Sequence, residues 1–151
     1  MANPALITSG KVLLDSNILV YVSNSYVPEF EITRKFVDDI YKSSILPTIS
    51  TQNIKEAYRV LTHPTYLKGN KISDINGIVN YWLDNMDVVY EGEQVWYEYL
   101  DLLTKYNVKG NEIFDLWIVA TMKANNIKTI ITVNDKHFKK YRGIKVVNPL
   151  E

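Results

Sequence analysis

Short apolar runs alternate along the chain with longer segments in which apolar residues recur every three or four positions. The short runs are rich in β-branched residues, which is typical of buried strands, and lie at residues 11–14, 47–50, 87–90, 129–133 and 144–147. The longer segments predict amphipathic helices at residues 31–44, 51–62, 73–86, 95–106 and 111–124, with shorter helices near residues 18–21 and 138. Continuously apolar strands between helices favour a parallel sheet covered on both faces. We therefore expect an α/β protein with three layers, α/β/α, and a central, mostly parallel sheet of about five strands.

Composition indicates one folded domain over residues 1–151, with its core at about residues 11–148. The chain has 151 residues, of which 46% are hydrophobic, and it shows no repeat or linker. No apolar run approaches the roughly 20 residues that span a bilayer, and the opening stretch MANPALITSGK lacks the regions of a secretory signal. The absence of cysteine excludes disulfides and metal–thiolate sites and fits a cytoplasmic protein.

The net charge is zero, but the bases are clustered. The segment from residue 136 to residue 145 contains no acid and five bases, which are Lys136, Lys139, Lys140, Arg142 and Lys145. A local basic patch can bind phosphates even when net charge vanishes. The alternative is an ordinary solvated basic face.

One acid stands out in the segment NEIFDLWIVATMK. At about 100° per residue, Asp115 shares a helix face with Ile118 and Met122, and the opposite face is apolar as well. A helix that is apolar nearly all round is usually buried, where an unpaired charge is costly. Asp115 therefore needs a cation, a donor network or a proton.

Three further acids are placed to join it. Asp15 and Asp135 directly follow two predicted strands, and ligand sites of parallel sheets lie at that edge. Glu56 lies on the polar side of a helix that follows a strand. At an effective dielectric of about 20, two carboxylates roughly 4 Å apart repel by about 4 kcal/mol. Oxygen ligands suit Mg²⁺ or Mn²⁺, so the four acids together favour a site for one or two such ions.

Each acid also has an ordinary structural interpretation. Asp15 could begin a turn, Glu56 could pair with Arg59 on a solvated face, and Asp135 could cap a helix. Asp115 has the weakest alternative because its helical neighbours are apolar. The metal hypothesis therefore rests on the four acids taken together.

Other chemistries find less support. The histidines His63 and His137 are not spaced as metal ligands, and no G-x-S-x-G, G-x-G-x-x-G or P-loop motif is present. Aromatic stripes at helical spacing are most simply core. Surplus aromatic residues that could instead lie on the surface are Tyr26, Tyr66, Tyr81, Trp96 and Tyr97.

Four segments in order, VLLDSNILVY, STQNIKEAYRVL, GNEIFDLWIVATM and TIITVNDKHF, resemble the PIN-domain nucleases. Among these the chain is most similar to the small toxins of VapBC toxin–antitoxin modules. The resemblance covers nearly the whole chain. It implies a parallel sheet between helices, acids at the strand ends, and Mg²⁺- or Mn²⁺-dependent cleavage of RNA.

The resemblance also implies roles for individual residues. Asp15, Asp115 and Asp135 would hold metal directly, and Glu56 would do so directly or through water. Ser16, Asn17 and Asn134 would orient the carboxylates or the attacking water. Glu112, one turn before Asp115, is a possible fifth acid, and we expect the bases that follow the fourth acid to hold the RNA backbone, namely Lys136, Lys139, Lys140 and Arg142.

The sequence thus predicts an endoribonuclease that hydrolyses phosphodiesters with metal-activated water, as the toxin of a toxin–antitoxin pair. The resemblance implies a homodimer held by an antitoxin protein. Two alternatives stay open. One is a PIN-like module that binds RNA or protein without cutting, and the other is a receiver-like or phosphatase-like enzyme in which Asp15 accepts phosphate.

Overall fold

The computed structural model describes residue 7 and residues 10–151. Most of the opening stretch expected to lack a secretory signal lies outside these residues. The elements in chain order are β1 (Gly10–Leu14), α1 (Ser16–Ser23), α2 (Phe30–Tyr41), β2 (Ile45–Ser50), α3 (Thr51–Leu61), α4 (Pro64–Leu67), α5 (Ile72–Asn85), β3 (Asp87–Val89), α6 (Glu93–Tyr106), α7 (Glu112–Ala124), β4 (Thr129–Ile131), α8 (Asp135–Phe138) and β5 (Lys145–Val147).

The five strands form one sheet in the order β3-β2-β1-β4-β5, and every neighbouring pair is parallel. Strand β1 lies at the centre, where Leu13 pairs with Thr48 of β2 on one side and Ile130 of β4 on the other. This arrangement confirms the predicted fold class. The carboxyl ends of β1 and β4 meet at one edge, where parallel sheets place their ligand sites.

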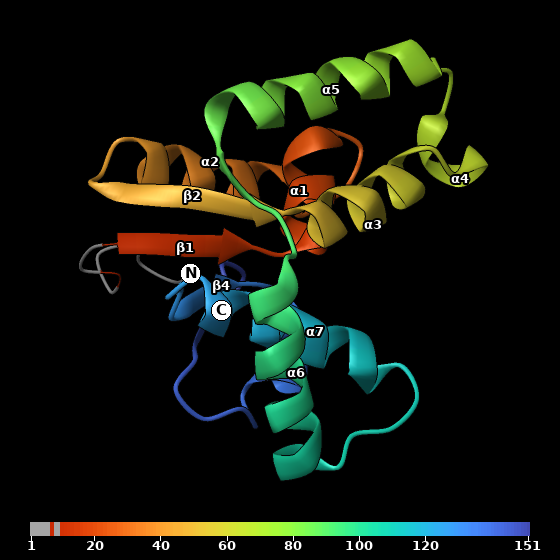
Figure 1. Ribbon diagram of the computed structural model, residues 1–151. Helices are drawn as coiled ribbons and strands as arrows, with labels where there is room; N and C mark the ends of the chain where they lie inside the picture. Colours follow the sequence, from red (N-terminus) through yellow and green to blue (C-terminus); the bar gives the residue numbers. More distant parts are fainter. Residues whose placement is uncertain (1–6, 8–9) are drawn as a thin grey trace.

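Helices cover both faces of the sheet, as Figure 1 shows. Successive strand residues point to opposite faces, so Val12 and Leu14 pack into the core beneath α1, α2, α3 and α5. Leu13, between them, packs into the second core beneath α6, α7 and α8. The three residues are fully buried, which explains why β1 reads as an unbroken apolar run.

Local sequence sets the ends of several elements differently from the prediction. The expected loop at residues 65–70 contains the single turn α4, whose first amide is capped by the ring of His63. Helix α5 begins at Ile72 and not after Ser73, because the amide of Lys71 donates to the Asp74 carboxylate at 2.6 Å. Strand β4 ends at Ile131, two residues earlier than expected.

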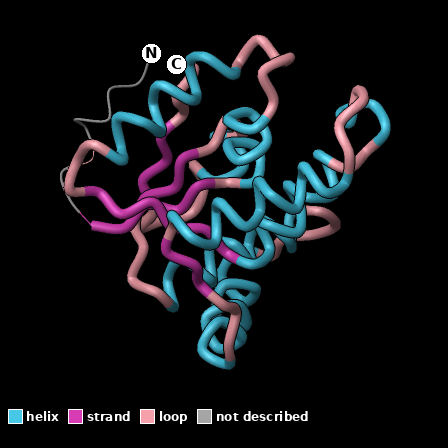
Figure 2. Tube along the Cα trace, turned by 90° about the horizontal axis from the view of Figure 1, so that it is seen from above, coloured by secondary structure: helices cyan, strands magenta, loops and turns pink. Residues whose placement is uncertain are grey.

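Helices α3, α4 and the start of α5 extend beyond the carboxyl edge of the sheet, on the right in Figures 1 and 2. Of these, α3 lies on one side of the site described below, and α7 lies on the other side. Within residue 7 and residues 10–151, no helix combines the length and apolar character needed to cross a membrane.

Candidate active site

Asp15 ends β1 and caps the first turn of α1. Its Oδ1 accepts from the Ser16 amide at 2.8 Å, and its Oδ2 accepts from Asn17 Nδ2 at 2.9 Å and Thr132 Oγ1 at 2.6 Å. Only 4% of the residue is exposed. Burial raises the pKa of Asp15, the bonds from Thr132 and Ser16 oppose that rise, and the charges of Glu56 and Asp115 add to it. The turn predicted as an alternative is present, but it forms one part of a larger network.

Two residues in this network escaped the sequence analysis. Thr132, the fully buried residue that follows β4, accepts from the Asn134 amide at 3.0 Å as well as donating to Asp15. Asn53, also fully buried, forms a capping box with Ser50 and places its Nδ2 3.4 Å from Asp15 Oδ1. The available signals were a hydroxyl in the apolar run TIITV and an amide three residues after a capping serine.

Glu56 extends from α3 toward the end of β1. Its Oε2 accepts from Ser16 Oγ at 3.2 Å, and its Oε1 accepts from Gln52 Nε2 at 2.7 Å. The core face of α3 carries Asn53 and Ala57, which places Glu56 at the border between core and solvent, half-buried. The Glu56 side chain therefore turns toward Ser16 rather than pairing with Arg59 on the same helix.

Asp115 lies in the first turn of α7, with 24% of its side chain exposed. Its Oδ2 lies 3.0 Å from His137 Nδ1. Burial raises the pKa of Asp115, the His137 contact opposes that rise, and the Glu56 charge adds to it. The expectation of a buried helix was wrong for this first turn, where Ile113 is 37% and Phe114 56% exposed, because both side chains line an open cleft beside Glu56.

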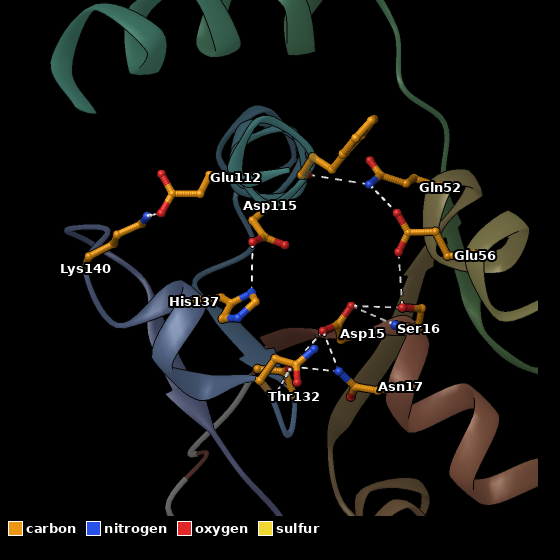
Figure 3. A network of polar contacts seen from close by, with 12 residues as sticks. Asp15, Ser16, Asn17, Gln52, Glu56, Glu112, Asp115, Thr132, His137 and Lys140 are labelled. Carbon is orange, nitrogen blue, oxygen red and sulfur yellow. Dashed lines mark hydrogen bonds and ion pairs between the residues drawn. The ribbon is translucent and has the colours of Figure 1, made fainter. Parts of the chain in front are cut away.

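Figure 3 shows Asp15, which directly follows β1, pointing into one central space together with Glu56 of α3 and Asp115 of α7. His137 flanks the same space and contacts Asp115. The three carboxylates are near enough for the Glu56 charge to raise the pKa of both others. The fold thus brings together three acids that lie on different elements and are more than 40 residues apart in the sequence.

Asp135 has a different environment. Its carboxylate forms an ion pair with Lys139 one turn along α8. Lys139, together with backbone amides at the start of the helix, lowers the pKa of Asp135, whereas burial, with a smaller contribution from nearby acids, raises the pKa of Asp15 and Asp115. Its neighbour Asn134 contributes a backbone amide to the Thr132 hydroxyl. In the described part of the chain, these contacts do not link Asp135 to the three-acid group.

The extra acid and two of the predicted RNA-contacting bases are also paired. Glu112 forms an ion pair with Lys140, which lowers the pKa of Glu112, and the Lys140 ammonium lies 5.3 Å from the centre of the Tyr141 ring. Lys139 is held by Asp135. All four bases, Lys136, Lys139, Lys140 and Arg142, are exposed. The ammonium groups of Lys139 and Lys140 would therefore exchange an internal carboxylate for a phosphate on binding RNA.

The donor set fits a divalent cation in charge and chemistry. Asp15, Glu56 and Asp115 supply only oxygen ligands, and their mutual repulsion is the kind that Mg²⁺ or Mn²⁺ relieves. Over residue 7 and residues 10–151, no cluster of three or more Asp, Glu and His groups is close enough to hold an ion jointly. Mg²⁺ commonly uses one or two carboxylates and keeps several waters, so a pair of these acids suffices.

The PIN domain family model matches residues 12–144. The chain belongs to this family. The match begins within β1, covers every element from α1 to α8 and includes all of the acids described above.

Solved structures support the same fold. The structure of VapBC2 from Rickettsia felis bound to a promoter DNA fragment is similar with a TM-score of 0.70 and 21% identity, covering 91% of this chain and 98% of that one. VapBC-1 from nontypeable Haemophilus influenzae gives 0.66 and 20% identity over 93% and 99%. VapC20 of Mycobacterium tuberculosis, a toxin that cleaves the sarcin–ricin loop, gives 0.60 and 9% identity over 79% and 86%. A search of the curated proteins found no match.

Proposed function

We propose that this PIN-domain protein is a metal-dependent endoribonuclease and acts as the toxin of a toxin–antitoxin pair. The observation that carries the proposal is the convergence of Asp15, Glu56 and Asp115 from β1, α3 and α7, with the pKa of Asp15 and Asp115 raised by burial and by the nearby acids. Perturbed carboxylates grouped at a sheet edge are typical of functional sites.

Asp15 and Asp115 would hold Mg²⁺ or Mn²⁺ directly, with Glu56 bound to the ion or to its water. A bound ion would supply Lewis-acid polarisation of the phosphodiester and lower the pKa of the attacking water. Ser16, Asn17 and Thr132 keep the Asp15 carboxylate oriented through their hydrogen bonds. Asp135 remains a proposed ligand, although its ion pair with Lys139 must first open.

The reaction would be a hydrolysis without a covalent intermediate. Water would add to phosphorus and lose one proton to solvent, the bond to the leaving ribose oxygen would break, and that oxygen would take up a proton from solvent. The donors on both Asp15 oxygens lower the nucleophilicity of the carboxylate, which makes a phosphoacceptor role for Asp15 less suitable. The other alternative is a module that binds RNA without cutting it, and a measurement of RNA cleavage distinguishes it from a nuclease.

The test is cleavage of single-stranded RNA by the wild type and by Asp115→Asn, each with Mg²⁺ and with EDTA. Asp84→Asn, an exposed acid on α5, is the matched control. We expect activity only in the wild type and in the control variant, and only with the cation. Equal activity of the wild type and Asp115→Asn in both conditions would refute the mechanism.

The toxin assignment predicts a homodimer and a cognate antitoxin protein. It is supported by the similarity to proteins solved as VapBC assemblies. Expression of the chain in a bacterial cytoplasm should arrest growth, and co-expression of a short neighbouring reading frame should relieve the arrest. Light scattering should give twice the monomer mass of 17.5 kDa. A monomer that leaves growth unaffected would contradict this part of the proposal.

A further inference from the structure

A cleft of about 610 Å³ lies beside the three acids, between the start of α3 and the first turns of α6 and α7. Its lining is mainly aromatic and apolar on the α6 and α7 side and polar on the α3 side. Its lining includes Gln52, Glu56, Glu91, Trp96, Phe114 and Trp117. This cleft explains why the apolar start of α7 is exposed.

The aromatic wall consists of rings that support one another edge to face. The centres of the Trp96 and Trp117 rings are 4.6 Å apart at 68°, and those of Tyr99 and Trp117 are 5.0 Å apart at 75°. Trp96 is nevertheless 55% exposed. A large ring that is fixed by neighbours and still open to solvent offers a preformed stacking surface.

The cleft is continuous with the group of acids because Glu56 belongs to both. Gln52 spans the junction, since its Nε2 donates to Glu56 Oε1 at 2.7 Å (Figure 3). The same nitrogen lies 3.5 Å from the Phe114 carbonyl oxygen. A molecule bound in the cleft would therefore lie directly beside Glu56.

The polar wall is rich in hydrogen-bond acceptors. The Glu91 carboxylate accepts from the Thr51 hydroxyl and, at 2.9 Å, from the backbone N–H of Gln52. These donors fix its position and leave it lone pairs, because a carboxylate can accept about four bonds. The side-chain carbonyl oxygen of Gln52 adds a further acceptor, and Lys55 adds a positive charge to this wall. Such a wall suits a flat ligand that carries N–H donors on its edge and an anionic group next to it.

We propose that this cleft binds an unpaired nucleobase next to the scissile phosphate of the RNA, and that it prefers a purine with an exocyclic amino group. The base would stack on Trp96 and donate to Glu91 or Gln52. Proteins recognise single-stranded RNA through such stacking and through hydrogen bonds to base edges. This inference rests on the proposed function and specifies its substrate as RNA with an unpaired base at the cleavage site.

The experiment measures binding of fluorescently labelled six-nucleotide RNAs by anisotropy in EDTA, where cleavage is not expected. The probes are oligoadenylate, oligouridylate and a chain of abasic ribose phosphates with the same charge. Wild type should bind oligoadenylate most tightly and the abasic chain most weakly. Trp96→Ala should weaken oligoadenylate binding about 5- to 100-fold, as loss of one stacked base predicts, and should leave abasic binding unchanged. Trp96→Phe, which keeps a ring, should restore most of the affinity.

Equal affinity of the wild type for oligoadenylate and the abasic chain would overturn the inference. Unchanged oligoadenylate binding in Trp96→Ala would also overturn it. If that variant keeps its RNA affinity but turns a dimer into a monomer, the aromatic wall is a protein interface and not a base-binding surface. Thermal unfolding of both variants checks that they fold. Failure of the proposed function gives a different result. Base-dependent binding without RNA cleavage in Mg²⁺ would support the base-binding role of the cleft and contradict the proposed nuclease activity.

Discussion

The Thr132 hydroxyl donates to Asp15 Oδ2 at 2.6 Å and joins the end of β4 to the end of β1. Both residues are buried, and the bond is one of the effects that restrain the rise in the pKa of Asp15. The two residues are 117 positions apart in the chain. The contact therefore makes the acid at the centre of the site depend on correct pairing of the two central strands.

Thr132→Val should destabilise the protein, because it keeps the shape but removes a donor from a buried carboxylate. A hydrogen bond to a charged group contributes about 1.5–3 kcal/mol. Urea unfolding should show a loss of this size, while Thr132→Ser should lose much less. Thr121→Val is the matched control, since among residue 7 and residues 10–151 that hydroxyl bonds only to the Trp117 carbonyl oxygen of its own helix, at 2.9 Å. Equal losses at both positions would mean that the charge of Asp15 is not involved.

The raised pKa of Asp115 predicts how stability changes with pH in the absence of divalent cations. The folded protein takes up this proton at a higher pH than the unfolded chain, whose aspartates titrate near 4. Ionised Asp115 therefore lowers stability at neutral pH, and the penalty disappears as the pH falls toward about 4. Asp115→Asn should raise the melting temperature in EDTA at pH 7 more than at pH 4.5. A difference that does not change with pH would contradict the shift.

Added Mg²⁺ should reverse the ranking of these two proteins at pH 7. An ion that binds only the folded state stabilises it by about 2.7 kcal/mol at 100 times its dissociation constant. The wild type should gain melting temperature with Mg²⁺, and Asp115→Asn should gain little. Ca²⁺-free and EDTA controls identify the effect of the added ion, and an equal gain in both proteins would place the ion elsewhere.

Asp135→Asn should reduce RNA cleavage less than Asp115→Asn. Asp135 is paired with Lys139, whereas Asp115 points into the space shared with Asp15 and Glu56. Loss of a supporting residue around a metal typically costs about 10- to 100-fold, so we expect at most this loss for Asp135→Asn and a larger loss for Asp115→Asn. Initial cleavage rates at saturating Mg²⁺ measure both. The opposite order would make Asp135 the more important ligand.

Reversal of charge at Lys139 and Lys140 should weaken RNA binding and flatten its salt dependence. Each phosphate contact to a single strand contributes about 0.7 to the slope of log affinity against log salt. Lys139→Glu with Lys140→Glu should therefore reduce that slope by about 1.4, and replacement of both by Arg should preserve it. Because both lysines are paired with acids in the free protein, an unchanged slope would show that those pairs persist in the complex.

The hydrophobic periodicity of the sequence was sufficient to predict the fold class. The run VLL indicated a strand buried on both faces, and the structure places Val12 and Leu14 in one core and Leu13 in the other. Element ends were less predictable, because they depend on single hydrogen bonds such as that from the Lys71 amide to Asp74. The same limit applies to α4, where a prolyl residue and His63 stabilise one turn in an expected loop.

The sequence by itself determined the main helices and strands, the mostly parallel sheet and the acids at strand and helix ends, because these follow from local periodicity and from residue type. Only the tertiary structure decided which acids share a space. It brought Asp15, Glu56 and Asp115 together and paired Asp135 with Lys139. It also placed Thr132 and His137 against two of the carboxylates. Such contacts depend on distances between segments remote in the chain, and these distances are set by how the helices pack against the sheet.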